Sequence, residues 1–241
     1  MDLSFDAPSY ELLSRGDTLA EQFYKQLARA ISSGSYAPNQ RLNIRRLADE
    51  IGASVTPVRE AVLRLVADGV LRITDKNAII VPERSETEID EIFEIRRTLE
   101  GDMAVSAAPH FSDKDVAFLA DTQEQFLTAL DAGNYKEVLQ LNSDFHFSIY
   151  THASSPLRLE IVRMLWLRIG PTLCYMYPIL HKGRSAHRRH EDIIEAARLR
   201  DPEALRTALL ADLASSQHAL RQYIRSRVAK PSRRSRATTS K

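Results

Sequence analysis

Six long segments of helical periodicity follow one another in the second part of this 241-residue chain, and no convincing strand interrupts them. Ser112 with Asp115 three residues later is a capping pattern, and Gly133-Asn134, Ser155-Pro156 and Asp201-Pro202 separate neighbouring segments. Helices of this length with short connections pack side by side as a bundle. The predicted helices are 86–109, 113–132, 135–153, 156–173, 185–199 and 202–228.

The first 82 residues show a different order of elements. A short helical pattern with Asn43 as its N-cap and Gly52 as its C-terminal stop is followed at once by another, which opens at Thr56 with Pro57 in the first helical position. This order of elements, a helix, a short helix, a helix and a hairpin, is typical of a winged helix-turn-helix. The predicted elements are helices over 17–33, 44–51 and 56–69 and strands over 70–74 and 78–82.

The sequence therefore predicts a mainly α protein with two domains. An N-terminal winged helix-turn-helix with a small β-hairpin wing occupies residues 1–82, and residues 83–86 form a linker. A C-terminal, all-α antiparallel helical bundle occupies residues 87–228. Residues 229–241 contain basic residues, no acidic ones and no apolar periodicity, which predicts a disordered basic tail.

Composition excludes several classes of protein. Apolar runs are too short for a transmembrane helix and the N-terminus has no apolar signal region, so we expect a cytoplasmic protein without a membrane partner. The single Cys174 excludes an internal disulfide framework. No glycine pattern of a Rossmann fold, a P-loop or a nucleophile elbow is present, and the chain is not expected to be an enzyme. The net charge of +1 does not by itself indicate nucleic-acid binding.

The helix-turn-helix carries the side chains that DNA recognition requires. Ser54, Thr56 and Arg59 stand at the start of its second helix, which in this motif lies in the major groove. Hydroxyl groups and helix-terminal N–H groups bind phosphate, and an arginine one turn into the helix reaches a guanine edge. The further candidates are Arg45 and Arg46 on the preceding helix and Lys76 at the tip of the wing. The alternative is that all six are solvated residues of an ordinary helical domain.

The stretch LADEIGASVTPVREAVLRLVADGVL resembles the DNA-binding domain of the GntR family of bacterial transcription regulators. The resemblance implies that Arg45, the turn hydroxyls of Ser54 and Thr56, and Arg59 contact DNA. Family members commonly have an arginine between the two hydroxyl residues, where this chain has Val55, so a base contact is lost or replaced by an apolar one.

Three predicted helices of the bundle each place polar side chains on or beside an apolar face. Asn142 and His146 lie one turn apart on one helix, His190 lies on the next-to-last, and Asp212 lies on the last. Buried polar groups need partners, so these meet either one another or a metal ion. Two imidazoles, a carboxylate and an amide oxygen suit zinc or another divalent ion. The alternative is that each histidine is an ordinary, satisfied core residue.

The helical half resembles the FCD effector domain of FadR-type GntR regulators, in the strings EIFEIRRTLEGDMAVSAA, NSDFHFSIY and RHEDIIEAARLRDPEALRTALLADL. Many such domains bind a divalent metal through an Asp four residues before a His and through two later histidines. His146 and His190 match this pattern, Asn142 takes the Asp position and Asp212 the last His position. The resemblance also implies that Arg96 faces the cavity and binds an effector carboxylate, whereas its spacing from Glu100 alone also fits an exposed ion pair.

These observations predict a homodimeric, ligand-responsive transcription regulator that binds double-stranded operator DNA. We expect the protein to be a repressor that is released from DNA when a small carboxylate effector binds at a divalent metal site, with zinc as the favoured ion. Two alternatives stay open on the sequence: a metal-dependent enzyme built on the bundle, and a regulator that senses the metal ion itself.

Overall fold

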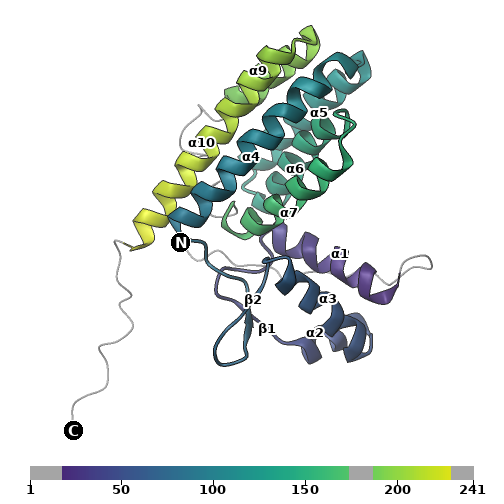
Figure 1. Cartoon of the computed structure of the whole chain (residues 1–241), viewed down its shortest axis with the longest axis vertical. Helices are drawn as coiled ribbons and strands as arrows, with labels where there is room; N and C mark the ends of the chain where they lie inside the picture. Colours follow the sequence, from purple (N-terminus) through teal and green to yellow (C-terminus); the bar gives the residue numbers. More distant parts are fainter. Residues whose placement is uncertain (1–17, 174–186, 229–241) are drawn as a thin grey trace.

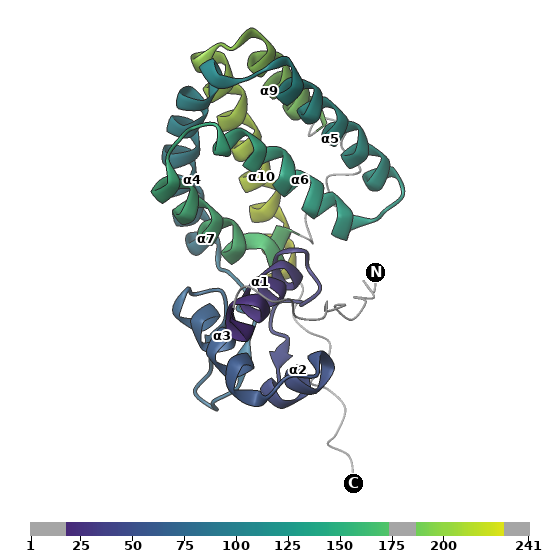
Figure 2. The same ribbon diagram turned by 90° about the vertical axis from the view of Figure 1, so that its right-hand side faces the viewer.

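The computed structural model describes residues 18–173 and 187–228, which fold into two lobes. A small lobe holds the first helices and a small sheet, and a long lobe holds the remaining helices (Figure 1). Helix α1 (Leu19–Ser32) of the small lobe lies against α7 (Pro156–Leu173) of the long lobe in both views, so these helices form the junction (Figure 2). The mainly α fold predicted from the sequence is confirmed.

The small lobe combines three helices with a three-stranded antiparallel sheet. Strand β3 is central, and its Ile80 lies opposite Arg41 of β1 and Arg72 of β2. The predicted hairpin is confirmed as β2 and β3. Strand β1 escaped prediction because two residues carry no alternating pattern and their partner lies far along the chain. The remaining elements are β1 (Arg41–Leu42), α2 (Ile44–Ile51), α3 (Val55–Ala67), β2 (Arg72–Ile73) and β3 (Ile79–Ile80).

The turn between α2 and α3 follows from its local sequence. Asn43 caps α2 with its side chain, and Gly52 ends the helix with a φ of 66°, in the left-handed region that glycine adopts freely. Helix α3 begins at Val55, so the predicted start at Thr56 is wrong by one residue and Pro57 is the third helical residue. Proline is tolerated there because the first N–H groups of a helix have no intrahelical acceptor.

The long lobe is a bundle in which α10 packs along α4 and α9, and α5 packs against α6. Ser85 with Glu88 and Ser112 with Asp115 form complete capping boxes at the starts of α4 and α5. Every described helix end lies within two residues of its predicted position. None of the helices in the described part of the chain has the length and hydropathy needed to span a bilayer. The helices are α4 (Glu86–Ala107), α5 (Asp113–Asp131), α6 (Tyr135–Thr151), α7, α9 (His187–Leu199) and α10 (Pro202–Val228), with a 3₁₀ turn at Ala108–His110.

The interior of the protein contains three apolar cores, two in the bundle and one in the small lobe. One core of the bundle contains Phe145 and Trp166, and a second contains Phe93 and Leu165. The third core fills the small lobe between its helices and sheet, and Leu167 of α7 packs against it from the bundle side. Consecutive residues of α7 therefore face different cores, and one of these cores belongs to the other lobe.

The connection between the lobes is short and structured. Of the predicted linker 83–86, Ser85 is the N-cap of α4 and Glu86 its first residue. Arg84 is only 7% exposed, although it lies between two domains. The connecting segment is therefore packed against both lobes. The predicted tail 229–241 lies outside the described residues.

Candidate functional site

The side chains predicted to contact DNA lie at the start of α3. Ser54, Thr56 and Arg59 are exposed, as direct DNA contact requires. Ser54 occupies the N-cap position but makes no side-chain capping hydrogen bond, so its hydroxyl is not used to stabilise the helix. Val55 between the two hydroxyl residues is 36% exposed and presents an apolar surface at the same helix end.

The three other predicted DNA contacts are exposed as well, and they differ in their surroundings. Arg46 donates to Glu50 over 2.7 Å within α2, an i,i+4 pair on the surface. The side chains of Arg45, Arg59 and Lys76 form no hydrogen bond or ion pair with the described residues. These three cations are therefore available to phosphate and base atoms without first breaking an internal contact.

Inside the bundle, three helices bring His146, His190 and Asp212 together. All three residues are buried, and one potential ligand atom of each lies within 4.8 Å of the others. Nε2 of His146 is 3.4 Å from Oδ2 of Asp212. Asn142 is half-buried one turn before His146 on α6. The predicted convergence of α6, α9 and α10 on one polar cluster is thus present in the fold.

Hydrogen bonds to the histidine rings orient both imidazoles. Nδ1 of His190 lies 2.6 Å from Oε1 of Gln123 on α5, so this nitrogen carries the proton and donates. The ring of Phe145 stacks on His190, with centroids 4.1 Å apart. Sequence reasoning missed Gln123, because a single glutamine on an amphipathic helix gives no signal of its role.

Glu100 of α4 is the acceptor at the centre of a second polar group beside the histidines. It accepts from Arg96 (Nε, 2.6 Å; Nη2, 3.3 Å), from the indole Nε1 of Trp166 (3.0 Å) and from the hydroxyl of Tyr150. The i,i+4 ion pair of the alternative is therefore present, but it is buried and not exposed, since Arg96 is 2% exposed and Glu100 fully buried. The guanidinium of Arg96 also stacks over Trp166, 4.4 Å from the ring centroid.

The two polar groups are joined through Tyr150. Its hydroxyl donates to Glu100 and lies 3.3 Å from Nδ1 of His146. Burial, and then the negative charge of Glu100, raise the pKa of Tyr150 well above its ordinary value, so the phenol keeps its proton. Because that single proton is given to Glu100, the phenol oxygen accepts from Nδ1–H of His146. This arrangement leaves Nε2 of His146 directed at Asp212.

The electrostatics of the cluster favour a charged Asp212. Burial acts to raise the pKa of its carboxyl, but the hydrogen bond and charge of His146, together with the charges of His190 and Arg96, lower the pKa overall. Arg96 is already neutralised by Glu100. Asp212 supplies the carboxylate of this cluster, so its buried charge is balanced either by protonated imidazoles or by a cation that His146 and His190 bind in their neutral form.

Two family models match the chain and together span most of both lobes. The model "Bacterial regulatory proteins, gntR family" matches residues 19–81, which form the winged helix-turn-helix. The model "FCD domain" matches residues 91–215, which carry the buried polar cluster.

Individual relatives agree with this assignment. The chain is 31% identical over 194 residues to the HTH-type transcriptional regulator McbR of Escherichia coli, an alignment that covers 80% of this chain and 88% of McbR. It is 30% identical over 197 residues to the uncharacterized HTH-type transcriptional regulator YdhC of Bacillus subtilis, covering 79% and 85% of the two chains.

Solved structures show the same fold. The structure of E. coli McbR/YncC superimposes with a TM-score of 0.80 at 30% identity, covering 86% of this chain and 99% of that one. A putative GntR regulator from Rhodococcus sp. RHA1 follows with a TM-score of 0.72 at 19% identity, covering 85% and 98%. The chain therefore belongs to the gntR family of bacterial regulatory proteins, in the group with an FCD domain, and it is a ligand-responsive DNA-binding transcription regulator.

Proposed function

We propose that this regulator holds a divalent metal ion, zinc in the first place, in the buried cluster of its FCD domain, and that the ion binds a small carboxylate effector. The observation that carries the proposal is the convergence of His146, His190 and Asp212 from three helices to within 4.8 Å. Two imidazoles and one carboxylate are ligands that zinc prefers, and further coordination positions remain for an effector.

The donor set fits a cation in charge and in orientation. A buried carboxylate needs a cationic partner, and a divalent ion held by two neutral imidazoles would neutralise Asp212. Hydrogen bonds at Nδ1 of both histidines leave Nε2 as the nitrogen that we assign to the metal, the arrangement in which an outer partner fixes each ligating ring. Asn142 lies one helical turn before His146, and we assign its amide oxygen as the fourth protein ligand.

Arg96 is the residue that we assign to the effector carboxylate. Glu100 binds its Nε and Nη2, while Nη1 has no hydrogen-bond partner among the described residues. Trp166 covers the guanidinium face and Tyr150 holds Glu100 from the opposite helix, so the cation is fixed in position before a ligand arrives. A fixed, desolvated arginine binds a carboxylate strongly because no ordering is required.

On DNA, we propose that a homodimer reads a two-fold operator, with Ser54, Thr56 and Arg59 in the major groove. Arg45 and Arg46 would contact phosphate from α2, and Lys76 would contact DNA from the wing. Two-fold symmetry of the protein then matches two half-sites. Relatives named HTH-type transcriptional repressors, RspR and GlaR of E. coli, support repression as the mode of action. We place this activity in the cytoplasm and assign no catalytic role.

The test combines metal analysis with DNA binding. Purified full-length protein is analysed for bound metal, and an operator is selected from random duplexes. Operator affinity is then measured in EDTA, in Zn²⁺, and in Zn²⁺ with small mono-, di- and tricarboxylates. We expect about one metal ion per chain and weaker operator binding when one carboxylate is added with Zn²⁺. Absence of bound metal after Zn²⁺ loading would contradict the metal site.

A further inference from the structure

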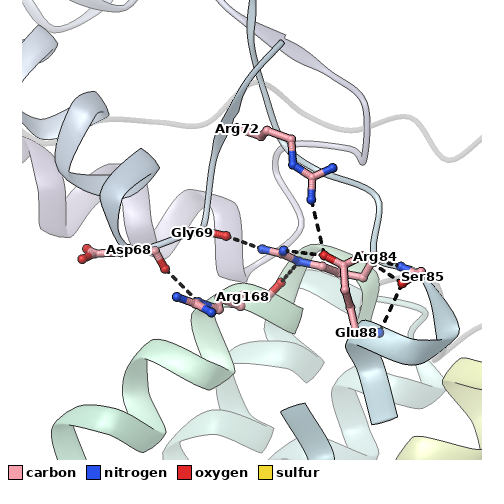
Figure 3. Close-up of polar contacts among 7 residues, drawn as sticks. All are labelled: Asp68, Gly69, Arg72, Arg84, Ser85, Glu88 and Arg168. Carbon is pink, nitrogen blue, oxygen red and sulfur yellow. Dashed lines mark hydrogen bonds and ion pairs between the residues drawn. The ribbon is translucent and has the colours of Figure 1, made fainter. Parts of the chain in front are cut away.

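Two arginines connect the small lobe to α7 through backbone carbonyls. Arg168 of α7 donates from Nε to the carbonyl of Asp68 over 2.8 Å. Arg84, between the lobes, donates from Nη2 to the carbonyl of the next residue, Gly69, and from Nε to the carbonyl of Arg168 over 3.3 Å (Figure 3). Each arginine therefore contacts the end of α3, and Arg84 contacts both lobes at once.

The carboxylate of Glu88 on α4 completes this set of contacts. Its Oε1 accepts from Arg84 over 3.2 Å and from Arg72 of β2 over 3.3 Å, while its Oε2 accepts from the backbone N–H of Ser85 (Figure 3). We call Arg84, Glu88, Arg168 and the carbonyls of Asp68 and Gly69 the clasp. Arg84 is buried, and its guanidinium needs these hydrogen bonds because a buried cation without partners is costly. The clasp is thus satisfied in one relative position of the lobes.

Two glycines allow the lobes to approach this closely. A Cβ atom on Gly69, whose φ is 70°, would lie 3.0 Å from the guanidinium carbon of Arg168. A Cβ atom on Gly170 would lie 2.6 Å from the Cα atom of Ser32 at the end of α1. One glycine stands on each side of the junction: a side chain at Gly170 would collide with the backbone of α1, and one at Gly69 would push against the guanidinium of Arg168.

Beside these close contacts, the junction contains an open pocket. A cavity of about 650 Å³ lies between α1 and α3 on one side and α6 and α7 on the other. Its walls include Tyr24 and Ala28 of the small lobe and Phe147 and Met164 of the bundle. Because this open pocket interrupts the apolar contacts between the lobes, we assign the fixed orientation to the directional contacts of the clasp.

We propose that Arg84 and Arg168 are positioning residues for DNA binding, which dock the winged helix-turn-helix on α7 in one orientation. In the homodimer, this orientation sets the distance between the two recognition helices and hence the half-site spacing that is accepted. Trp166, two residues before Arg168 on α7, donates to Glu100, which Tyr150 joins to His146 of the buried cluster. A ligand that moves Trp166 would therefore move the clasp, a step that rests on the proposed function.

The docking is tested by trypsin, which cleaves after exposed arginines. In the full-length protein, Arg84 is buried in the clasp, and cleavage between Arg84 and Ser85 requires the clasp to open. We expect Arg168→Ala to raise the cleavage rate at this bond about tenfold or more, since a hydrogen bond from a charged group is lost. Arg168→Lys is expected to restore part of the protection.

The matched control is Arg158→Ala on the same helix, because Arg158 pairs only weakly with Asp102 of the bundle, at 3.8 Å. It should leave cleavage after Arg84 at the wild-type rate. Cleavage after Arg84 that is equally slow in wild type and Arg168→Ala, with both proteins folded by circular dichroism, would overturn the clasp.

Operators with altered half-site spacing show whether Arg168→Ala changes the position of the DNA-binding lobes or only weakens the folded protein. Affinity is measured for selected operators whose half-sites are moved apart or together by two base pairs. Wild type should lose much of its affinity on altered spacers, whereas Arg168→Ala should bind all spacers within a few-fold of one another. A variant that binds every spacer less well, in the wild-type ratio, would overturn the positioning role.

Adding Zn²⁺ in the cleavage experiment distinguishes the proposed metal site from the proposed clasp. Trp166 is the sole tryptophan of the chain, so its fluorescence reports binding of Zn²⁺ at the cluster. A fluorescence change together with a changed cleavage rate after Arg84 supports the coupling through α7. A fluorescence change without any effect on cleavage overturns the coupling. If Trp166 fluorescence does not respond and no metal is bound, the proposed metal site is contradicted. The clasp is tested separately, by the Arg168 variants.

Discussion

The indole N–H of Trp166 donates to Oε1 of Glu100 over 3.0 Å, which ties α7 to the buried polar group on α4. The same indole ring lies over the guanidinium of Arg96 and 5.2 Å from the ring of His146. Two residues further along α7, Arg168 binds the small lobe. Helix α7 therefore touches the candidate effector site and the DNA-binding lobe within a single helical turn.

Replacement of Glu100 should strongly destabilise the bundle. Glu100→Gln removes the charge that compensates Arg96 in the interior, and breaking such a buried pair costs about 3–5 kcal/mol. The free energy of unfolding is measured by urea titration with Trp166 fluorescence. As a control, Glu50→Gln breaks the exposed surface pair with Arg46 and should leave the free energy of unfolding nearly unchanged. Equal losses in the two variants would contradict the buried role of Glu100.

Loss of the recognition-helix arginine should weaken specific DNA binding. Arg59 is exposed and has no internal partner among the described residues, so its guanidinium is available to a guanine edge. Arg59→Ala should cost about 1–3 kcal/mol of operator affinity, with relaxed preference at one base pair. Gel-shift titrations of the selected operator and of point-mutated operators measure both effects. Arg158→Ala, far from α3 in the sequence, should bind as wild type does, and unchanged affinity of Arg59→Ala would reject the contact.

The two buried histidines should be necessary for metal binding. In the double variant His146→Ala, His190→Ala, two of the assigned ligands are lost, and stoichiometric metal should disappear from Zn²⁺-loaded protein. Inductively coupled plasma mass spectrometry of desalted protein gives the metal content. His218→Ala supplies the control, since His218 is exposed on α10 and bonds to Gln222. Wild-type metal content in the double variant would place the ion elsewhere.

The basic C-terminal segment should add attraction to DNA that does not depend on sequence. Residues 229–241 contain five Lys and Arg side chains and no acidic residue, and each phosphate contact releases counterions. Truncation after Ala229 should reduce the slope of log affinity against log salt concentration, with little change in preference among operators. Fluorescence anisotropy over a salt series measures the slope, and identical slopes for truncated and full-length protein would exclude a role of this segment.

The secondary structure was largely predictable because its signals are local. The capping box at Ser112, the N-cap Asn43 and the helix stop at Gly52 act over a few residues, and the structure confirms each of them. Strand β1 was missed because its two residues acquire their conformation from pairing with β3, which lies far along the chain. Burial of Arg84 was missed for the same reason, since its acceptors come from α3 and α7.

The sequence by itself determined the order of helices, the place of Ser54, Thr56 and Arg59 at the start of α3, and the residue types of the polar cluster, because periodicity and capping are properties of neighbouring residues. Only the tertiary structure decided that Gln123 orients His190, that Tyr150 joins His146 to Glu100, and that Arg84 and Arg168 connect the lobes. These contacts join side chains from different helices. Their existence depends on how whole helices pack, and helix packing is a property of the folded chain that local sequence does not encode.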